Sequence, residues 1–373
     1  MGTKVVKRST PTQAPVAVGM GLVALDIVFT ADDDTPPRSY AGGTCGNVLT
    51  ILSYLGWSSI PVSRLRNDKA SKRLLEDLHQ WGVSTKFVSQ TPDGSTPVIV
   101  QRIKRSSNGV PRHSFSWRCP SCGAYLPGYK PVLAAQIEAA ALSVPKGEVF
   151  FFDRVSRATL LMAAISRKRG AVVCFEPASV GDPALFKEAW AVSHVVKYSH
   201  ERLSEMAELG LGHAKYGNVL LEIETIGAEG LRYRSWLPAA ATKSWVSVEP
   251  FSVPDVKDTS GAGDWFTAGV LNSLARKGAA GLAKSTRIQL RTAVENGQAL
   301  AAWNCRFEGA RRGMYEVSRS ELESAVKQIL GRSAGAVVEA SESSGKAHED
   351  VAELCHSCVE QTSAVKKQGR GQP

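Results

Sequence analysis

The chain has 373 residues, of which 43% are hydrophobic and 21% are charged. These fractions are typical of a folded globular protein and exclude a disordered, collagen-like or disulfide-dense chain. At roughly 100–200 residues per domain, the length predicts two or three domains, or one large α/β domain with an attachment. The formal net charge of +10 suits nucleic acid or an anionic small molecule, and the scattered basic residues do not decide between them.

The N-terminal end superficially imitates a secretory signal, because basic residues precede an apolar stretch. That stretch contains two glycines, ends at Asp26 and has no small-residue cleavage site, so we expect a flexible leader over residues 1–14 followed by a strand. Polar residues such as Gln136 and Glu138 interrupt every apolar run before it could span a membrane. The sequence therefore predicts a cytoplasmic protein without membrane contact.

Short β-branched runs alternate with segments of helical period along most of the chain. The pattern predicts strands at 16–29, 61–65, 147–155, 171–177, 194–199 and 218–227, and helices at 47–57, 71–83 and 157–170. Alternation of this kind is typical of an α/β fold with a mostly parallel central sheet and helices on both faces. We expect one such domain over residues 15–331.

Two stretches break this alternation. Residues near 85–118 resemble two antiparallel strands around a turn, which predicts a small flap, and a Cys-x-x-Cys insertion follows near 117–130. Residues 332–373 are poor in aromatics and rich in Ser, Gly, Glu and Lys, so we expect a low-order tail with a short helix near Val351–Cys355.

The run DTSGAGDWFTAG combines small residues with an acidic one at the start of an apolar helical pattern. The amides of Gly261, Ala262 and Gly263 would lie at the helix N-terminus, where unsatisfied donors and the helix dipole favour an anion. Asp264 at the same position can take a proton from an attacking hydroxyl while those amides hold the charge of a transferred phosphoryl group. The alternative is that Asp264 simply caps the helix.

This run resembles the C-terminal signature of the ribokinase-like (PfkB) carbohydrate kinases. A second similarity lies in AGGTCGN, where Gly42, Gly43 and Asn47 match the family's Gly-Gly-x-x-x-Asn segment, and a third is Asp26 at the end of the first strand. The resemblance covers roughly Val16–Gly331 and implies a three-layer ribokinase-like fold. It also implies an ATP- and Mg²⁺-dependent kinase whose acceptor is held by these residues.

The resemblance extends to the nucleotide side of the site. Thr225, Gly227 and Gly230 match the family's Thr-x-Gly-x-x-Gly loop, and Asn296 and Gly309 match positions that flank the adenine. The resemblance also implies a cofactor-binding role for Lys197, and an acceptor-binding role for Asp153.

Two departures from the family pattern concern the metal. The chain has Glu176, Pro177 and Ala178 where Asp-Pro-Asn is common. The glutamate expected to organise magnesium is replaced by Arg202, with Glu201 one place early. A shifted helix would let Glu201 or Glu205 approach a magnesium-bound water.

Two other nucleotide motifs are not supported. Gly19-Met-Gly21 imitates a dinucleotide fingerprint, but the residues after it read as a strand where the fingerprint requires a helix. No Gly-x-x-x-x-Gly-Lys-Ser/Thr loop occurs anywhere in the sequence.

Four of the seven cysteines form two Cys-x-x-Cys pairs, Cys119 with Cys122 and Cys355 with Cys358. In a reducing compartment such pairs favour metal or redox chemistry over disulfides. Our hypothesis is that the tail folds back and the four thiolates bind one Zn²⁺. The alternatives are two independent reduced pairs, a redox switch, or a zinc ion that bridges two chains. The remaining cysteines lie in apolar segments and are expected in the core: Cys45, Cys174 and Cys305.

The sequence as a whole predicts a kinase that transfers phosphate from ATP to a hydroxyl of a sugar, sugar acid or nucleoside, with the flap closing over the acceptor. Arg154 beside Asp153 favours an acidic or phosphorylated acceptor, or else forms an ion pair within the fold. A homodimer formed through the flap is compatible with the resemblance. The alternative of another class is a non-catalytic zinc-containing module that binds nucleic acid or protein, although the chain lacks clustered Lys/Arg with interleaved aromatics.

Overall fold

The computed structural model describes residues 13–30, 36–105, 111–202, 209, 218–331, 351–355 and 357–359. Most of the expected leader, Glu205, the turn at the tip of the expected flap and most of the expected tail lie outside these residues. Among the described helices, none has both the length and the apolar character needed to cross a membrane.

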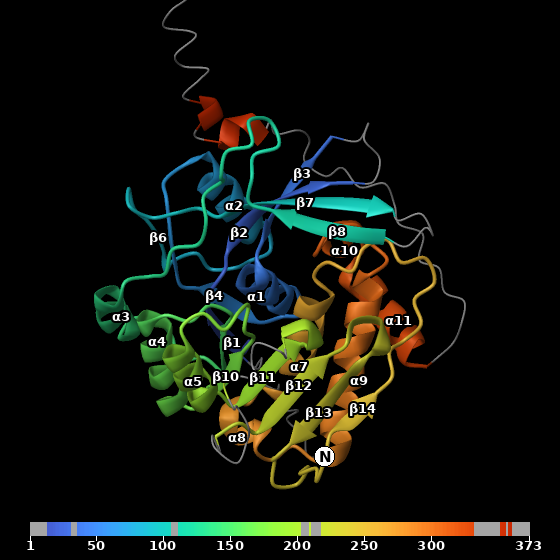
Figure 1. The fold of residues 1–373 in the computed structure, drawn as a ribbon. Helices are drawn as coiled ribbons and strands as arrows, with labels where there is room; N and C mark the ends of the chain where they lie inside the picture. The colour runs from blue at the N-terminus through green and yellow to red at the C-terminus, as the bar shows by residue number, and fades with distance from the viewer. Residues whose placement is uncertain are drawn as a thin grey trace, which may run out of the picture.

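The centre of the fold is an eight-stranded sheet, shown in Figure 1. Its strands lie in the order β14 (Val246–Val248), β13 (Leu231–Ser235), β12 (Leu221–Thr225), β11 (Val195–Ser199), β10 (Val172–Phe175), β9 (Val149–Phe152), β1 (Val16–Met20) and β4 (Ser58–Pro61). The pairs from β4 to β12 are parallel, and β13 and β14 are antiparallel additions at one edge. This arrangement confirms the predicted α/β class.

Helices cover both faces of this sheet. One face packs against α1 (Thr44–Tyr54), α7 (Ala262–Leu274) and α9 (Arg287–Asn304), and the other against α3 (Ala134–Ala141), α4 (Arg157–Lys168) and α5 (Pro183–Val192). Strand β9 shows why helices can pack on both faces. Phe151 belongs to the apolar cluster on the α1, α7 and α9 side, while Phe150 and Phe152 belong to the cluster on the opposite side. Because successive side chains of a strand point to opposite faces, a run of buried phenylalanines fills both layers.

The remaining helices are shorter or peripheral. They are α2 (Lys69–Gln80), α8 (Gly278–Leu282), α10 (Gly313–Glu316), α11 (Arg319–Leu330) and the 3₁₀ turns η1 (His200–Arg202), η3 (Gly227–Glu229) and η4 (Val351–Leu354). Helix α2 begins with a capping box in which Asp68 accepts a hydrogen bond from the Ser71 amide.

A separate four-stranded sheet forms the lid, in the order β3 (Arg38–Gly42), β2 (Ala24–Phe29), β7 (Val98–Arg105) and β8 (Pro111–Ser116). Strands β7 and β8 are antiparallel, as predicted for the flap. The prediction missed β3 and assigned the residues of β2 to the central sheet. It also included residues of β6 (Val88–Gln90), which pairs instead with β5 (Ser63–Leu65).

The predicted single strand at 16–29 is wrong, because β1 and β2 belong to different sheets. The break lies at Gly21 and Leu22. The Leu22 amide donates to Asp153 Oδ1 at 2.8 Å, and a Cβ on Gly21 would lie 1.7 Å from the same oxygen. The side chain that follows β9 therefore takes the place of a neighbouring strand at this point and allows the chain to leave the central sheet.

Candidate active site

The N-terminus of α7 carries the small residues and the aspartate that the sequence singled out. The helix begins at Ala262 after Gly261, whose backbone is left-handed at φ 73°. A Cβ on Gly261 would lie 2.5 Å from the Ala310 carbonyl oxygen, so only glycine fits this position. The first turn therefore places helix N-terminal amides beside the buried Asp264, although the Ala262 amide donates to the Thr259 carbonyl oxygen at 3.2 Å, and anion binding here stays a prediction.

Asn47 on α1 contacts Asp264 directly. The Asn47 Nδ2 atom donates to Asp264 Oδ2 over 2.7 Å, although 217 positions separate the two residues in the sequence. Asn47 Oδ1 in turn accepts a hydrogen bond from Arg311 Nε at 3.0 Å. The segment assigned to the acceptor and the segment assigned to phosphoryl transfer therefore meet at one point.

The surroundings of Asp264 favour its neutral form. Burial raises the pKa of this carboxyl to about 8, and the nearby charge of Glu176 acts in the same direction. The Asn47 hydrogen bond and the charge of Lys197 act against this rise. A carboxyl with a pKa near physiological pH has the property expected of a general base.

Lys197 lies beneath the start of α7. Its Nζ atom contacts Glu176 Oε1 at 2.5 Å and the Gly263 carbonyl oxygen at 3.4 Å. Glu176 also accepts a hydrogen bond from the Thr267 hydroxyl at 2.7 Å. The ion pair thus ties the ends of two central strands to α7, and the cofactor-binding role of Lys197 stays a prediction.

Asp26, Gly42 and Gly43 form a second part of the site. A Cβ on Gly42 would lie 1.8 Å from Asp26 Oδ2, so this glycine leaves room for the carboxylate. Burial raises the pKa of Asp26 to about 7, against the lowering effects of the Gly43 amide and Arg311. Asp26 Oδ1 is buried and has no hydrogen-bond partner among the described residues, as expected of an atom that binds a ligand.

Arg311 is a site residue that the sequence reasoning missed. It is 2% exposed, it pairs with Asp77 at 2.9 Å, and it donates to the Ala41 carbonyl oxygen as well as to Asn47. Its Nη1 atom has no partner within the described part of the chain. The only sequence signal was its position two residues after Gly309, in a run otherwise interpreted as scattered positive charge.

Asp153 forms the ion pair that was the alternative to acceptor binding. Its Oδ2 atom lies 2.7 Å from Arg154 Nη1, and its Oδ1 atom accepts the Leu22 amide. Burial raises its pKa to about 6, partly offset by Arg154. Because both oxygens have protein partners, Asp153 has a clear role in shaping the turn at Gly21, and its contact with an acceptor stays a prediction.

Asp258, in the loop before α7, was also missed. It is buried and accepts hydrogen bonds from the Ser260 amide at 3.0 Å and the Gly309 amide at 2.9 Å. Gln101 on lid strand β7 donates to Asp258 Oδ2 and to the Ser260 hydroxyl, both at 2.7 Å. The lid is therefore hydrogen-bonded to the loop that sets the anion site. Gly309 lies at this loop, and its proposed role beside the adenine stays untested.

The residues expected to surround the nucleotide lie on a different set of elements. Thr225 ends β12, Gly227 begins η3 and Gly230 follows it, and the two glycines have positive φ values of 58° and 91°. Asn296 lies on α9. Glu201 lies in η1 and is exposed, and none of the hydrogen bonds or ion pairs among the described residues joins it to the site.

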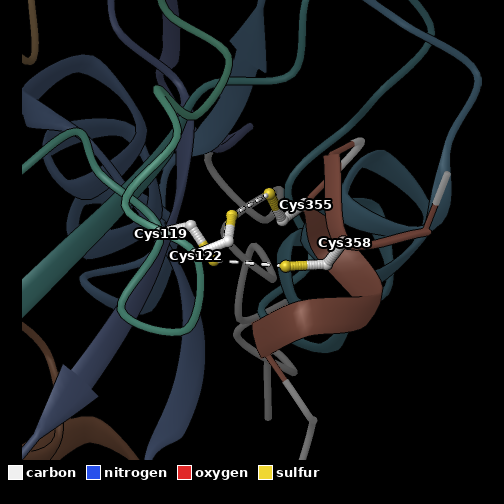
Figure 2. A group of neighbouring side chains, drawn as sticks. All are labelled: Cys119, Cys122, Cys355 and Cys358. Atoms are coloured by element: carbon white, nitrogen blue, oxygen red, sulfur yellow. Dashed lines mark hydrogen bonds between the residues drawn. The ribbon is translucent and has the colours of Figure 1, made fainter. Parts of the chain in front are cut away.

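The two Cys-x-x-Cys pairs lie together, as Figure 2 shows. The four sulfur atoms of Cys119, Cys122, Cys355 and Cys358 all lie within 4.8 Å of one another. The thiolate set is compatible with zinc. Cys45 and Cys174 are buried in the core as predicted, while Cys305 is half-buried.

Comparison with known proteins identifies the family of this chain. The model of the pfkB family carbohydrate kinases matches residues 21–316. A fructokinase of Vibrio alginolyticus is 24% identical over 265 residues, which are 66% of this chain and 80% of that protein.

Two solved structures share the fold. The ATP-bound fructokinase of Xylella fastidiosa superposes with a TM-score of 0.65 and 19% identity, covering 84% of this chain and 98% of that one. The aminoimidazole riboside kinase of Salmonella enterica, solved with its riboside and an ATP analogue, has a TM-score of 0.62 and 20% identity over 83% of this chain and 99% of that one. The chain belongs to the pfkB family of carbohydrate kinases and is an ATP-dependent phosphotransferase.

Proposed function

We propose that this kinase phosphorylates a hydroxyl group of a sugar or sugar-like acceptor, with Asp264 as the general base. The observation that carries the proposal is the hydrogen bond from Asn47 to Asp264 at 2.7 Å. It joins the segment that would hold the acceptor to the helix that would hold the transferred phosphoryl group. An acceptor hydroxyl bound beside Asn47 would lie next to the carboxylate that removes its proton.

The start of α7 supplies the complementary positive potential. In phosphoryl transfer most of the charge spreads over the oxygens of the moving group, so fixed donors contribute more than covalent chemistry does. The amides of Gly261, Ala262 and Gly263 lie within one turn of Asp264. The Ala262 amide donates to the Thr259 carbonyl oxygen at 3.2 Å, so we assign the phosphoryl contacts mainly to Gly261 and Gly263. Proton removal and charge stabilisation can therefore act on one bound acceptor.

The residues of this chain also fit a magnesium ion carried by ATP. Magnesium supplies charge neutralisation at the phosphates when it is bound, and in proteins it is held by one or two carboxylates besides the phosphates. Glu176 offers such a carboxylate: its Oε1 atom contacts Lys197 and its Oε2 atom accepts a hydrogen bond from Thr267 on α7, which leaves each oxygen one further lone pair for a metal-bound water. We assign this role to Glu176 in place of Glu201, which is exposed on η1.

Two buried polar atoms on the proposed acceptor side could form hydrogen bonds with a ligand. Asp26 Oδ1 accepts hydrogen bonds, Arg311 Nη1 donates them, and neither has a partner among the described residues. Asp26 lies beside Gly42, and Arg311 donates to the carbonyl oxygen of the preceding residue, Ala41, so both groups border the same short segment. An acceptor with several hydroxyls satisfies both, which favours a free sugar. A nucleoside is the second candidate, because its ribose offers the same hydroxyls and a riboside kinase is among the structures that share the fold.

An acceptor screen tests this proposal. ADP release would be measured with ATP, magnesium and each of fructose, ribose, a sugar acid, inosine and aminoimidazole riboside. At least one acceptor should raise ADP release well above the rate with water alone, and Asp264→Asn should remove that increase. A panel in which no hydroxyl compound stimulates ADP release would argue against the proposed acceptor class.

A further inference from the structure

Four cysteine thiols from two distant parts of the chain form a compact cluster. Cys119 Sγ lies 3.8 Å from Cys358 Sγ, and Cys122 Sγ lies 3.6 Å from Cys355 Sγ. With zinc–sulfur bonds of about 2.3 Å, a tetrahedral site places its sulfurs about 3.8 Å apart. All pairs in the cluster lie within 4.8 Å, so it has the dimensions of a metal site with four thiolate ligands.

The first pair lies in a tight turn that follows lid strand β8. The Gly123 amide donates to the Cys119 carbonyl oxygen at 2.9 Å, and the Cys119 amide donates to the Ala124 carbonyl oxygen at 2.8 Å. Gly123 has φ 73°, the left-handed conformation that such a turn requires. The Arg118 side chain donates to the Gly123 carbonyl oxygen at 3.1 Å and to the Tyr125 hydroxyl at 2.8 Å, which adds two contacts within the turn.

The second pair lies in the tail, just after η4. Val351 and Leu354 are buried against the main core, and the Val359 amide donates to the Cys355 carbonyl oxygen at 3.0 Å. The only ion pair found between the described tail residues and the rest of the described chain joins Lys69 to Glu353 on the surface. Ala352, Cys355 and Cys358 also pack on this core. Ordering a chain segment costs conformational entropy, and a bound metal ion would add stabilisation to these contacts.

We propose that Cys119, Cys122, Cys355 and Cys358 bind one structural Zn²⁺ and thereby fasten the tail to the turn after β8. Each sulfur forms one bond to zinc, and each thiol proton is released to solvent, so the step needs no oxidant or reductant. All four ligands come from the protein, and three of the cysteines are buried. A closed site of this kind is structural and leaves no position for a reacting water.

The site also supports the segment that leads to the acceptor. The Leu126 amide donates to the Trp117 carbonyl oxygen at 2.8 Å, and the Ser95 hydroxyl donates to the Gly128 carbonyl oxygen at 2.6 Å. The next residue, Tyr129, packs against the cluster of Leu22, Ala24 and Ile99 at the start of β2 and on β7. Zinc would therefore position Tyr129 beside the site; this consequence rests on the proposed kinase function, whereas the metal content does not.

Metal analysis of the full-length protein, purified under reducing conditions, tests the site. Wild-type protein should contain about one zinc per chain, and Cys119→Ser and Cys358→Ser should each lower the content to background. Cys305→Ser is the matched control, because this cysteine lies outside the cluster, and it should keep its zinc. These results need no substrate, so a failed acceptor screen would leave them unaffected.

Hydrogen exchange on the wild-type chain covers the case in which a variant does not fold. Chelation of the metal should increase exchange in residues 117–126 and 351–359 together, and added zinc should restore protection in both segments. Purified protein that has no zinc and does not bind added zinc would overturn the proposal. So would iron in place of zinc, a mass that shows two disulfides, or zinc that survives in both variants.

Discussion

The Asn47 amide and the Asp264 carboxylate are hydrogen-bonded over 2.7 Å at the centre of the candidate site. Asn47 lies on α1, three residues after Thr44, which begins that helix, and Asp264 lies in the first turn of α7. Because Asn47 also accepts a hydrogen bond from Arg311, its side-chain amide has a fixed orientation. The orientation of the proposed base is therefore set by a side chain from the opposite half of the chain.

Stability should depend on pH through this carboxyl. The pKa of Asp264 rises from 3.8 to about 8, with burial as the main cause and Glu176 and Asp153 as contributing charges opposed by Lys197. A raised carboxyl pKa stabilises the fold below pH 3.8, and this contribution is lost as the pH rises toward 8. Ligand-free wild-type protein should therefore lose thermal stability between pH 5 and about pH 8, measured by calorimetry.

Asp264→Asn isolates the contribution of this group. The amide keeps the acceptor atom for Asn47 and cannot ionise, so the variant should lose less stability over the same range. Part of the pH dependence should remain, because the pKa values of Asp26 and Asp153 are raised to about 7 and about 6. Identical pH profiles for the two proteins would show that Asp264 titrates near its ordinary value.

Gly42→Ala should impair acceptor binding selectively. The added Cβ would lie 1.8 Å from Asp26 Oδ2 and push the carboxylate out of place. The KM for the acceptor should rise about 10-fold or more, since a hydrogen bond to a charged group contributes about 1.5–3 kcal/mol, while the KM for ATP should stay within about twofold. Steady-state kinetics with each substrate varied in turn measure both values.

Gly46→Ala is the matched control for this substitution. Gly46 lies in the same AGGTCGN segment as Gly42. A Cβ added at Gly46 would lie 3.6 Å from Val23, which is an ordinary van der Waals contact. This variant should keep both KM values. If Gly42→Ala and Gly46→Ala changed the two constants alike, the proposed contact between Asp26 and the acceptor would be wrong.

Gln101→Leu should weaken the link between the lid and the anion site. Gln101 supplies one of the hydrogen bonds to the buried Asp258, and Ser260 and Gly309 supply others. Loss of this donor should cost about 1–3 kcal/mol of stability. The substitution should also lower kcat about 10- to 100-fold, because small displacements of groups near the reacting atoms slow the reaction strongly.

Gln90→Leu provides the comparison, since Gln90 on β6 donates its amide to Ser71 and makes no described hydrogen bond to this loop. Its kcat should equal that of the wild type in the same assay. A Gln101→Leu enzyme with full kcat would show that the lid contact has no influence on the anion site.

Much of the fold and part of the site could be predicted because they depend on local patterns. Alternating apolar runs indicated the central sheet, and small residues before Asp264 indicated a helix N-terminus, which the structure places at Ala262. The split of residues 16–29 could not be predicted, because it depends on the Leu22 amide meeting Asp153, a contact 131 positions apart. The central roles of Arg311 and Asp258 were missed for the same reason, since their partners come from distant segments.

The rate of phosphoryl transfer in Asp264→Asn tests the proposed mechanism most directly. With the best acceptor from the screen and saturating ATP and magnesium, kcat should fall about 10²- to 10⁴-fold, the usual contribution of a general base. ATP binding measured by calorimetry should stay nearly unchanged, since Asp264 acts on the acceptor hydroxyl. An Asp264→Asn enzyme that turns over at the wild-type rate would contradict the assignment of Asp264 as the base.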